Sequence, residues 1–107
     1  MNRACVCDLN GRVAIVTGGC GGLGAAQAML LAHCGAAVLI ADRRAAAAET
    51  SAALNRKGLE ARSLSMDVID PTEWLSAINN VRDWKGRLDI LINNAEILNR
   101  TNILDTQ

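Results

Sequence analysis

The segment TGGCGGLG, residues 17–24, places five glycines directly after the apolar run Val13–Val16. Glycine accepts positive φ and lets a ligand approach the main chain closely. A helix that begins at the end of such a turn points its free N–H groups and the positive end of its dipole into the turn, an arrangement that binds phosphate. Two glycine patterns overlap here: G-x-G-x-x-G at Gly19, Gly21 and Gly24, and T-G-x-x-x-G-x-G at Gly18, Gly22 and Gly24. Either pattern predicts a phosphate-binding turn if a strand precedes it and a helix follows.

An acidic residue, Asp42, ends the next apolar run, 18 residues after Gly24. A carboxylate in this position can accept hydrogen bonds from both hydroxyls of an adenosine ribose and repels a 2′-phosphate, which favours NAD over NADP. Arg43 and Arg44 act in the opposite direction, because a guanidinium pairs with phosphate. The alternative interpretation is that Asp42 caps the helix that follows it.

These motifs need strands and helices in alternation. Apolar and β-branched runs predict strands at 12–18, 36–42, 61–68 and 87–95, and helix-forming runs predict helices at 23–34, 43–58 and 70–86. Asp70, Pro71 and Glu73 open the third helix with the residues of a capping box. The alternation predicts an α/β fold of the Rossmann-like, doubly wound type: a truncated parallel sheet of about four strands in the order 3-2-1-4, with helices on both faces. The β-branched runs and the glycines between them disfavour an all-α fold.

From Gly11 onward the chain resembles the short-chain dehydrogenase/reductase family. The resemblance rests on four motifs in the same order: Thr17-Gly18…Gly22-Leu23-Gly24, Asp42, Asp67-Val68 and Asn93-Asn94-Ala95. It implies that Asp67 meets the adenine amino group, that Val68 packs near the adenine, and that Asn94 and Ala95 line the ribose side of the cofactor. The expected cofactor-binding residues are Gly18, Cys20, Gly22, Leu23, Gly24, Asp42, Arg43, Asp67, Val68, Asn94 and Ala95.

The implied function is that of the N-terminal part of an NAD(P)-dependent oxidoreductase, which moves hydride between a nicotinamide cofactor and a carbonyl or alcohol. NAD is the expected cofactor and NADP the less favoured one. Flavin or S-adenosylmethionine could use a similar glycine turn, but the motifs at Asp67-Val68 and Asn93-Asn94-Ala95 argue against both. The alternative is a non-catalytic dinucleotide-binding or interaction module, or a truncated relic without function.

Two departures from the family pattern affect this expectation. Glu96 stands where the family has glycine, and its bulk and negative charge beside a doubly negative pyrophosphate are expected to weaken dinucleotide binding. The family's catalytic serine and Tyr-x-x-x-Lys pair have no counterpart, since the chain contains no tyrosine at all. No residue can therefore be assigned as catalytic, and the chain is expected to be inactive alone.

Length and charge bound the remaining possibilities. The 107 residues predict an N-terminal extension at 1–10 and one partial Rossmann domain at 11–107. Eleven basic and eleven acidic residues give a formal charge of zero, which suggests neither a nucleic-acid partner nor an anionic membrane surface. No apolar run approaches the ~20 residues of a membrane span, and the start lacks the pattern of a secretory signal, so a cytoplasmic protein is expected.

Two further expectations concern the cysteines and the sheet edge. Cys5 and Cys7 form a C-x-C pair with no second pair to complete a metal site, and a disulfide framework is not expected in this context. The fourth predicted strand, around Asp89–Asn93, leaves one edge of the sheet unpaired. An unpaired edge favours self-association.

Overall fold

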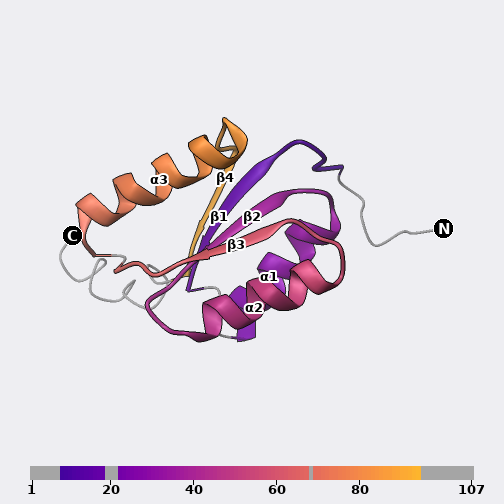
Figure 1. The fold of residues 1–107 in the computed structure, drawn as a ribbon, viewed down its shortest axis with the longest axis horizontal. Helices are drawn as coiled ribbons and strands as arrows, with labels where there is room; N and C mark the ends of the chain where they lie inside the picture. The colour runs from indigo at the N-terminus through magenta and orange to yellow at the C-terminus, as the bar shows by residue number, and fades with distance from the viewer. Residues whose placement is uncertain (1–7, 19–21, 68, 95–107) are drawn as a thin grey trace, which may run out of the picture.

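The computed structural model describes residues 8–18, 22–67 and 69–94. Strands and helices alternate along the chain: β1 (Val13–Thr17), α1 (Gly22–His33), β2 (Ala37–Ala41), α2 (Ala46–Arg56), β3 (Ala61–Leu64), α3 (Pro71–Lys85) and β4 (Ile90–Asn93). The strands form one parallel sheet in the order β3-β2-β1-β4 (Figure 1). The predicted Rossmann-like fold and its strand order are confirmed. The strands are shorter than the predicted ranges; β2, for example, is Ala37–Ala41 where 36–42 is expected.

The sheet is covered on both faces, which explains the unbroken apolar runs of the two central strands. On one face, alternate residues such as Ala14, Val16 and Ile40 pack against α1 and α2. On the other face, Ile15 and Leu39 pack against α3. Figure 1 shows α3 on the opposite side of the sheet from α1 and α2. The central strands are therefore held in place by packing on both sides.

The start of α3 differs from the predicted capping box. Asp70 caps the helix as expected, and its Oδ1 accepts a hydrogen bond of 2.9 Å from the Thr72 N–H. The carboxylate of Glu73 does not return to the Asp70 N–H; Glu73 Oε1 accepts from the Asp67 N–H instead, at 2.6 Å. The Asp70 N–H donates to the Asp67 carbonyl at 3.1 Å, which closes a turn and leaves the Asp67 N–H facing the helix. The capping-box prediction, in which the Glu73 carboxylate accepts from the Asp70 N–H, was therefore wrong.

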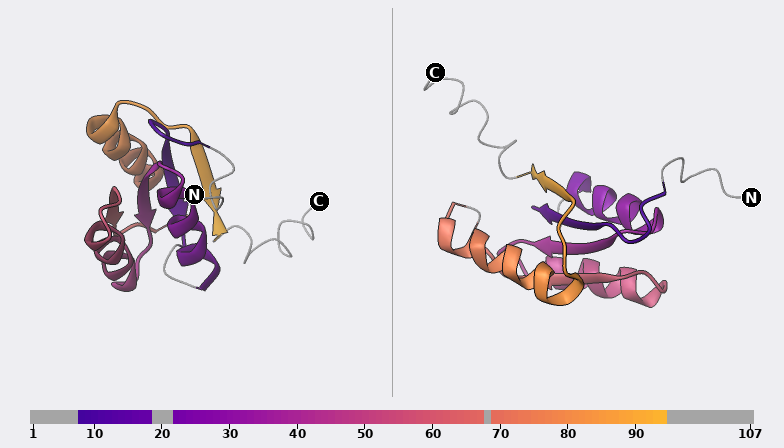
Figure 2. Two further views of the ribbon diagram at one scale, coloured as in Figure 1. Left: turned by 90° about the vertical axis from the view of Figure 1, so that its right-hand side faces the viewer. Right: turned by 90° about the horizontal axis from the view of Figure 1, so that it is seen from above.

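β4 lies beside β1 at one edge of the sheet (Figure 2), and Asp89, the residue before it, anchors it there. The Asp89 N–H donates to the Val13 carbonyl at 2.8 Å, and the Val13 N–H donates to Asp89 Oδ2 at 2.9 Å. Hydrogen bonds from the Arg87 guanidinium hold the pKa of Asp89 below its ordinary value, and the Val13 N–H acts in the same direction. These two hydrogen bonds, one to a backbone carbonyl and one to the Asp89 side chain, set the register of β4 one residue before the strand begins.

Several expectations from sequence concern metal, disulfide and membrane chemistry. Cys5, Cys7 and Cys20 lie outside the described residues, and Cys34 forms no disulfide within the described part of the chain. In residues 8–18, 22–67 and 69–94 no group of three or more histidine, cysteine or acidic side chains could hold a metal ion. No helix of this part of the chain has the length and apolar character needed to cross a membrane.

Candidate functional site

The carboxyl ends of the four parallel strands meet at one edge of the sheet, and most of the predicted site residues follow directly on these ends. Thr17, the last residue of β1, pairs with Ala41 of β2 on one side and with Asn93 of β4 on the other. After β1 the chain forms β2 on one side of β1, and it later forms β4 on the other side. In open α/β sheets such a reversal of strand order marks the place where ligands bind.

The glycine turn begins in the conformation that its sequence predicts. Gly18 has φ of 65° and donates its N–H to the Ala41 carbonyl at 3.1 Å, which ties the start of the turn to the end of β2. Gly19, Cys20 and Gly21 lie outside the described residues. α1 begins at Gly22, and its first turn contains no acidic side chain. Among the described residues, no atom lies within 4 Å of where a Cβ on Gly22 would stand.

Asp42 follows β2 beside this turn, and its carboxylate is held by Arg44. Asp42 Oδ1 accepts from the Arg44 backbone N–H at 2.9 Å and from Nε at 3.1 Å, while Oδ2 accepts from Arg44 NH2 at 3.0 Å. The Asp42 side chain is 9% exposed and that of Arg44 is 63% exposed. α2 starts at Ala46 with Ala45 as its N-cap and no side-chain cap. The alternative interpretation, that Asp42 caps this helix, is therefore wrong.

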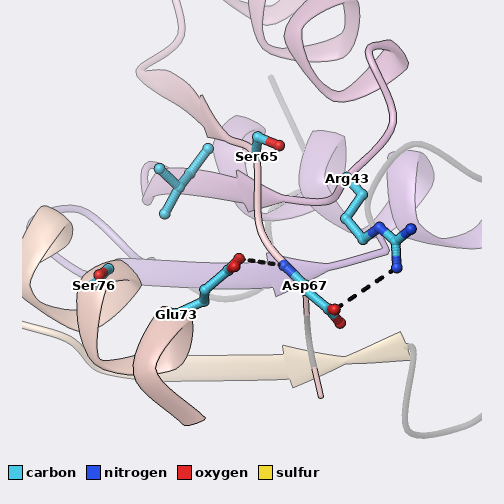
Figure 3. Close-up of a pocket in the computed structure, with 6 residues that line it drawn as sticks. Arg43, Ser65, Asp67, Glu73 and Ser76 are labelled. Carbon is cyan, nitrogen blue, oxygen red and sulfur yellow. Dashed lines mark hydrogen bonds and ion pairs between the residues drawn. The ribbon is translucent and has the colours of Figure 1, made fainter. Parts of the chain in front are cut away.

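An open hollow of roughly 460 Å³ lies next to the ends of β2 and β3 (Figure 3). Its lining comprises Arg43, Leu64, Ser65, Asp67, Glu73 and Ser76. Arg43 NH1 lies 3.8 Å from Asp67 Oδ2, and Asp67 Oδ1 accepts from the Ile69 N–H at 3.1 Å. The structure thus brings together the predicted residues Arg43 and Asp67, with the Asp67 main chain fixed by Glu73. Val68, predicted to pack near an adenine, lies outside the described residues.

On the other side of β1, a polar network joins β1, α1 and β4. Thr17 Oγ1 donates to Asn93 Oδ1 at 2.8 Å. Asn94 Nδ2 donates both to the Thr17 carbonyl at 3.0 Å and to Gln27 Oε1 at 2.7 Å. Because the Thr17 carbonyl can only accept, the Asn94 amide must turn its nitrogen toward it. Among the residues that the structure describes, the buried acceptor Asn94 Oδ1 has no hydrogen-bond partner.

Sequence reasoning missed several of the residues that shape this site. Gln27 is one polar residue on a helix of mostly small side chains, and no spacing rule connects it with Asn94. No pattern in the sequence marks Ser65 or Ser76 as residues of a site. Glu73 could have been found, because it lies six residues after Asp67, but it was assigned to the cap of α3. Ala95 and Glu96 lie outside the described residues, so the predicted effect of Glu96 on dinucleotide binding stays a prediction.

The parallel sheet, its strand order and the glycine turn at the end of β1 define a Rossmann-like α/β fold. The comparison with protein families is more specific. The family model described as short chain dehydrogenase matches residues 12–107. The chain therefore belongs to the short-chain dehydrogenase family, as the four motifs predicted.

Individual relatives support this assignment. A cyclopentanol dehydrogenase of Comamonas sp. is 35% identical over 99 residues, which are 92% of this chain and 40% of that protein. An uncharacterized oxidoreductase of Caenorhabditis elegans is 47% identical over 91 residues, 82% of this chain and 29% of that protein. The crystal structure of a hydroxysteroid dehydrogenase from Escherichia coli matches with a TM-score of 0.76 and 30% identity, over 79% of this chain and 37% of that one. The chain thus spans well under half the length of these relatives.

Proposed function

We propose that this chain forms the dinucleotide-binding part of an NAD(P)-dependent oxidoreductase that moves hydride between a nicotinamide cofactor and a carbonyl or alcohol. The observation that carries the proposal is the positive φ of Gly18, which directly follows β1 between the ends of β2 and β4; Asp42 follows β2, Asn94 follows β4, and α1 begins at Gly22. When bound, the cofactor supplies or accepts the hydride, while the protein binds and orients it.

The described residues fit such a cofactor at three places. The first N–H groups of α1 suit the negative pyrophosphate, because the first helical turn carries no acidic side chain to compete with it. We expect Asp42 to accept from an adenosine ribose once the Arg44 guanidinium, which donates to it in this structure, moves aside. The hollow beside Asp67 is large enough to take an adenine ring. Asn94 offers a buried acceptor on the opposite side of β1, and we expect it to serve the second ribose. Asp42 favours NAD over NADP.

In the family that the chain resembles, the acid/base of hydride transfer is a tyrosine, and these 107 residues include none. We therefore propose that the chain as given binds a dinucleotide but does not catalyse hydride transfer by itself. The dehydrogenases named above suggest alcohols or carbonyl compounds as substrates of the complete activity. No described residue is assigned as catalytic.

The cofactor preference can be tested by replacing Asp42 with alanine. The unchanged chain should bind NADH more tightly than NADPH and should not bind S-adenosylmethionine. Asp42→Ala removes the acceptor for the ribose hydroxyls and should weaken NADH binding about tenfold, the effect of one hydrogen bond to a charged group, so that the preference for NADH is lost. Quenching of the fluorescence of Trp74, which adjoins the hollow-lining Glu73, and of Trp84 reports binding.

A matched control is Asp83→Ala, which removes an exposed carboxylate of α3 far along the chain from the glycine turn. This variant should keep the preference for NADH. If Asp42→Ala keeps it as well, Asp42 does not choose between the two dinucleotides. Equal binding of S-adenosylmethionine and NADH by the unchanged chain would contradict the proposed cofactor class.

We also propose self-association through β4. This strand pairs with β1, and no described residue pairs with its other edge. Leu91 at its centre is 53% exposed. Light scattering after size-exclusion chromatography should show a mass that rises with concentration, and Leu91→Lys should hold the chain as a monomer because a charge on the edge blocks strand pairing. Leu75→Lys, at an exposed leucine of α3, is the control; a monomeric parent chain would refute the proposal.

A further inference from the structure

Arg44 forms hydrogen bonds with the carboxylate of Asp42, to which the proposed function assigns the adenosine ribose of the cofactor. A carboxylate offers about four lone-pair positions for hydrogen bonds. Arg44 fills three of the positions on Asp42, one with its backbone N–H and two with its guanidinium. At most one position remains, whereas the two hydroxyls of an adenosine ribose need two. A bound NAD can therefore form its full set of hydrogen bonds with Asp42 only if the Arg44 guanidinium moves away.

The charge of Asp42 is reduced by the same contact. A free carboxylate at this position repels the 2′-phosphate of NADP, and this repulsion is the physical basis of a preference for NAD. With a guanidinium bound side-on to both oxygens, the pair carries no net charge. The repulsion against a 2′-phosphate is then much weaker.

The neighbouring Arg43 does not share this role. Its guanidinium is directed toward Asp67, at 3.8 Å from Oδ2, and lines the hollow (Figure 3). Of the two side chains in the Asp42–Arg44 pair, that of the arginine is the more exposed. Asp42 is nearly buried, and its N–H is fixed to the Leu64 carbonyl at 3.0 Å, whereas the Arg44 side chain is largely exposed.

We propose that Arg44 is a specificity-determining residue that acts through Asp42 and relaxes the preference for NAD over NADP. The inference rests on the proposed dinucleotide binding. The native chain then discriminates only moderately between the two cofactors. Removing the guanidinium returns both lone pairs and the full negative charge to Asp42, so that NADH binds better and NADPH worse.

The test measures Kd for NADH and for NADPH by tryptophan fluorescence in the unchanged chain and in Arg44→Ala. The ratio of Kd for NADPH to Kd for NADH should rise about tenfold, because one charge-assisted hydrogen bond is gained by NADH and one compensated charge is lost for NADPH. Arg44→Gln keeps much of the side-chain length without the charge and should give the same shift. Arg56→Ala removes an exposed positive charge from the last turn of α2 and should leave the ratio within about twofold of the parent value.

A double-mutant cycle separates the action through Asp42 from a direct contact with phosphate. In an Asp42→Asn background, Arg44→Ala should no longer change the ratio. A shift of equal size in that background would overturn the inference, because Arg44 would then act on the ligand itself. A ratio that is unchanged in Arg44→Ala, while the parent chain binds both dinucleotides, would overturn this inference alone. If the parent chain binds neither dinucleotide, the proposed function fails and the inference fails with it.

Discussion

Replacing Asn94 with aspartate should lower the free energy of unfolding by about 3 kcal/mol, although the two side chains have nearly the same shape. The Asn94 amide nitrogen donates to the Thr17 carbonyl and to Gln27 Oε1, both of which are acceptors. An aspartate would lose both donated hydrogen bonds and would turn a negative oxygen toward two other oxygens. Urea unfolding followed by tryptophan fluorescence measures the loss.

The matched control is Asn79→Asp, the same chemical change at an exposed position of α3. There the new charge stays in water, and the free energy of unfolding should change by no more than about 0.5 kcal/mol. If the two variants unfold at the same urea concentration, the network around Asn94 does not stabilise the fold. The loss in Asn94→Asp should also shrink at low pH, where a protonated carboxyl can again donate one hydrogen bond.

The second large effect is expected at Gly35, where β2 is about to begin. Gly35 has φ of 107°, and an added Cβ would lie 2.9 Å from the backbone nitrogen of Asn10. The Leu9–Asn10 segment cannot easily withdraw, because the Leu9 N–H donates to the Cys34 carbonyl at 2.8 Å. Gly35→Ala should therefore cost about 3 kcal/mol, from backbone strain and steric overlap together.

Gly58 separates these two causes. It also has a positive φ, 82°, but an added Cβ there would meet nothing within 4 Å. Gly58→Ala should cost about 1 kcal/mol, the strain alone. Thermal unfolding of the three proteins, monitored by circular dichroism, gives the order parent, Gly58→Ala, Gly35→Ala. Equal melting temperatures for the two variants would show that the contact with Asn10 is of no consequence.

The fold could be predicted because its signals are local and repeated. Each buried strand is an apolar run that ends at a glycine or an acid, and each helix is a run of helix formers closed by glycine. The same reasoning placed the glycine turn and Asp42 correctly at adjacent strand ends. The ends of the elements were harder to predict. Asp67 lies beyond the end of β3 and Arg43 lies before the start of α2, although the sequence places both inside predicted elements.

The contacts within the site could not be predicted, since they depend on the direction of single side chains. Arg43 and Arg44 are neighbours of the same type, yet one faces Asp67 and the other holds Asp42. The sequence alone predicted the same role for both arginines, which is to weaken the preference for NAD that Asp42 favours. Glu73 fitted a capping rule well and nevertheless binds elsewhere, because the turn after β3 brings another N–H closer.

The network of Thr17, Gln27, Asn93 and Asn94 has a consequence for how separate events at this edge influence each other. It fastens the last residue of β1, where the glycine turn starts, to both α1 and β4. We expect a ligand that steadies the turn to steady β4 as well, and a chain that docks on β4 to strengthen binding of that ligand by the same factor, since such coupling is reciprocal. With both proposed events, the nucleotide and the neighbouring strand would act as allosteric effectors of each other.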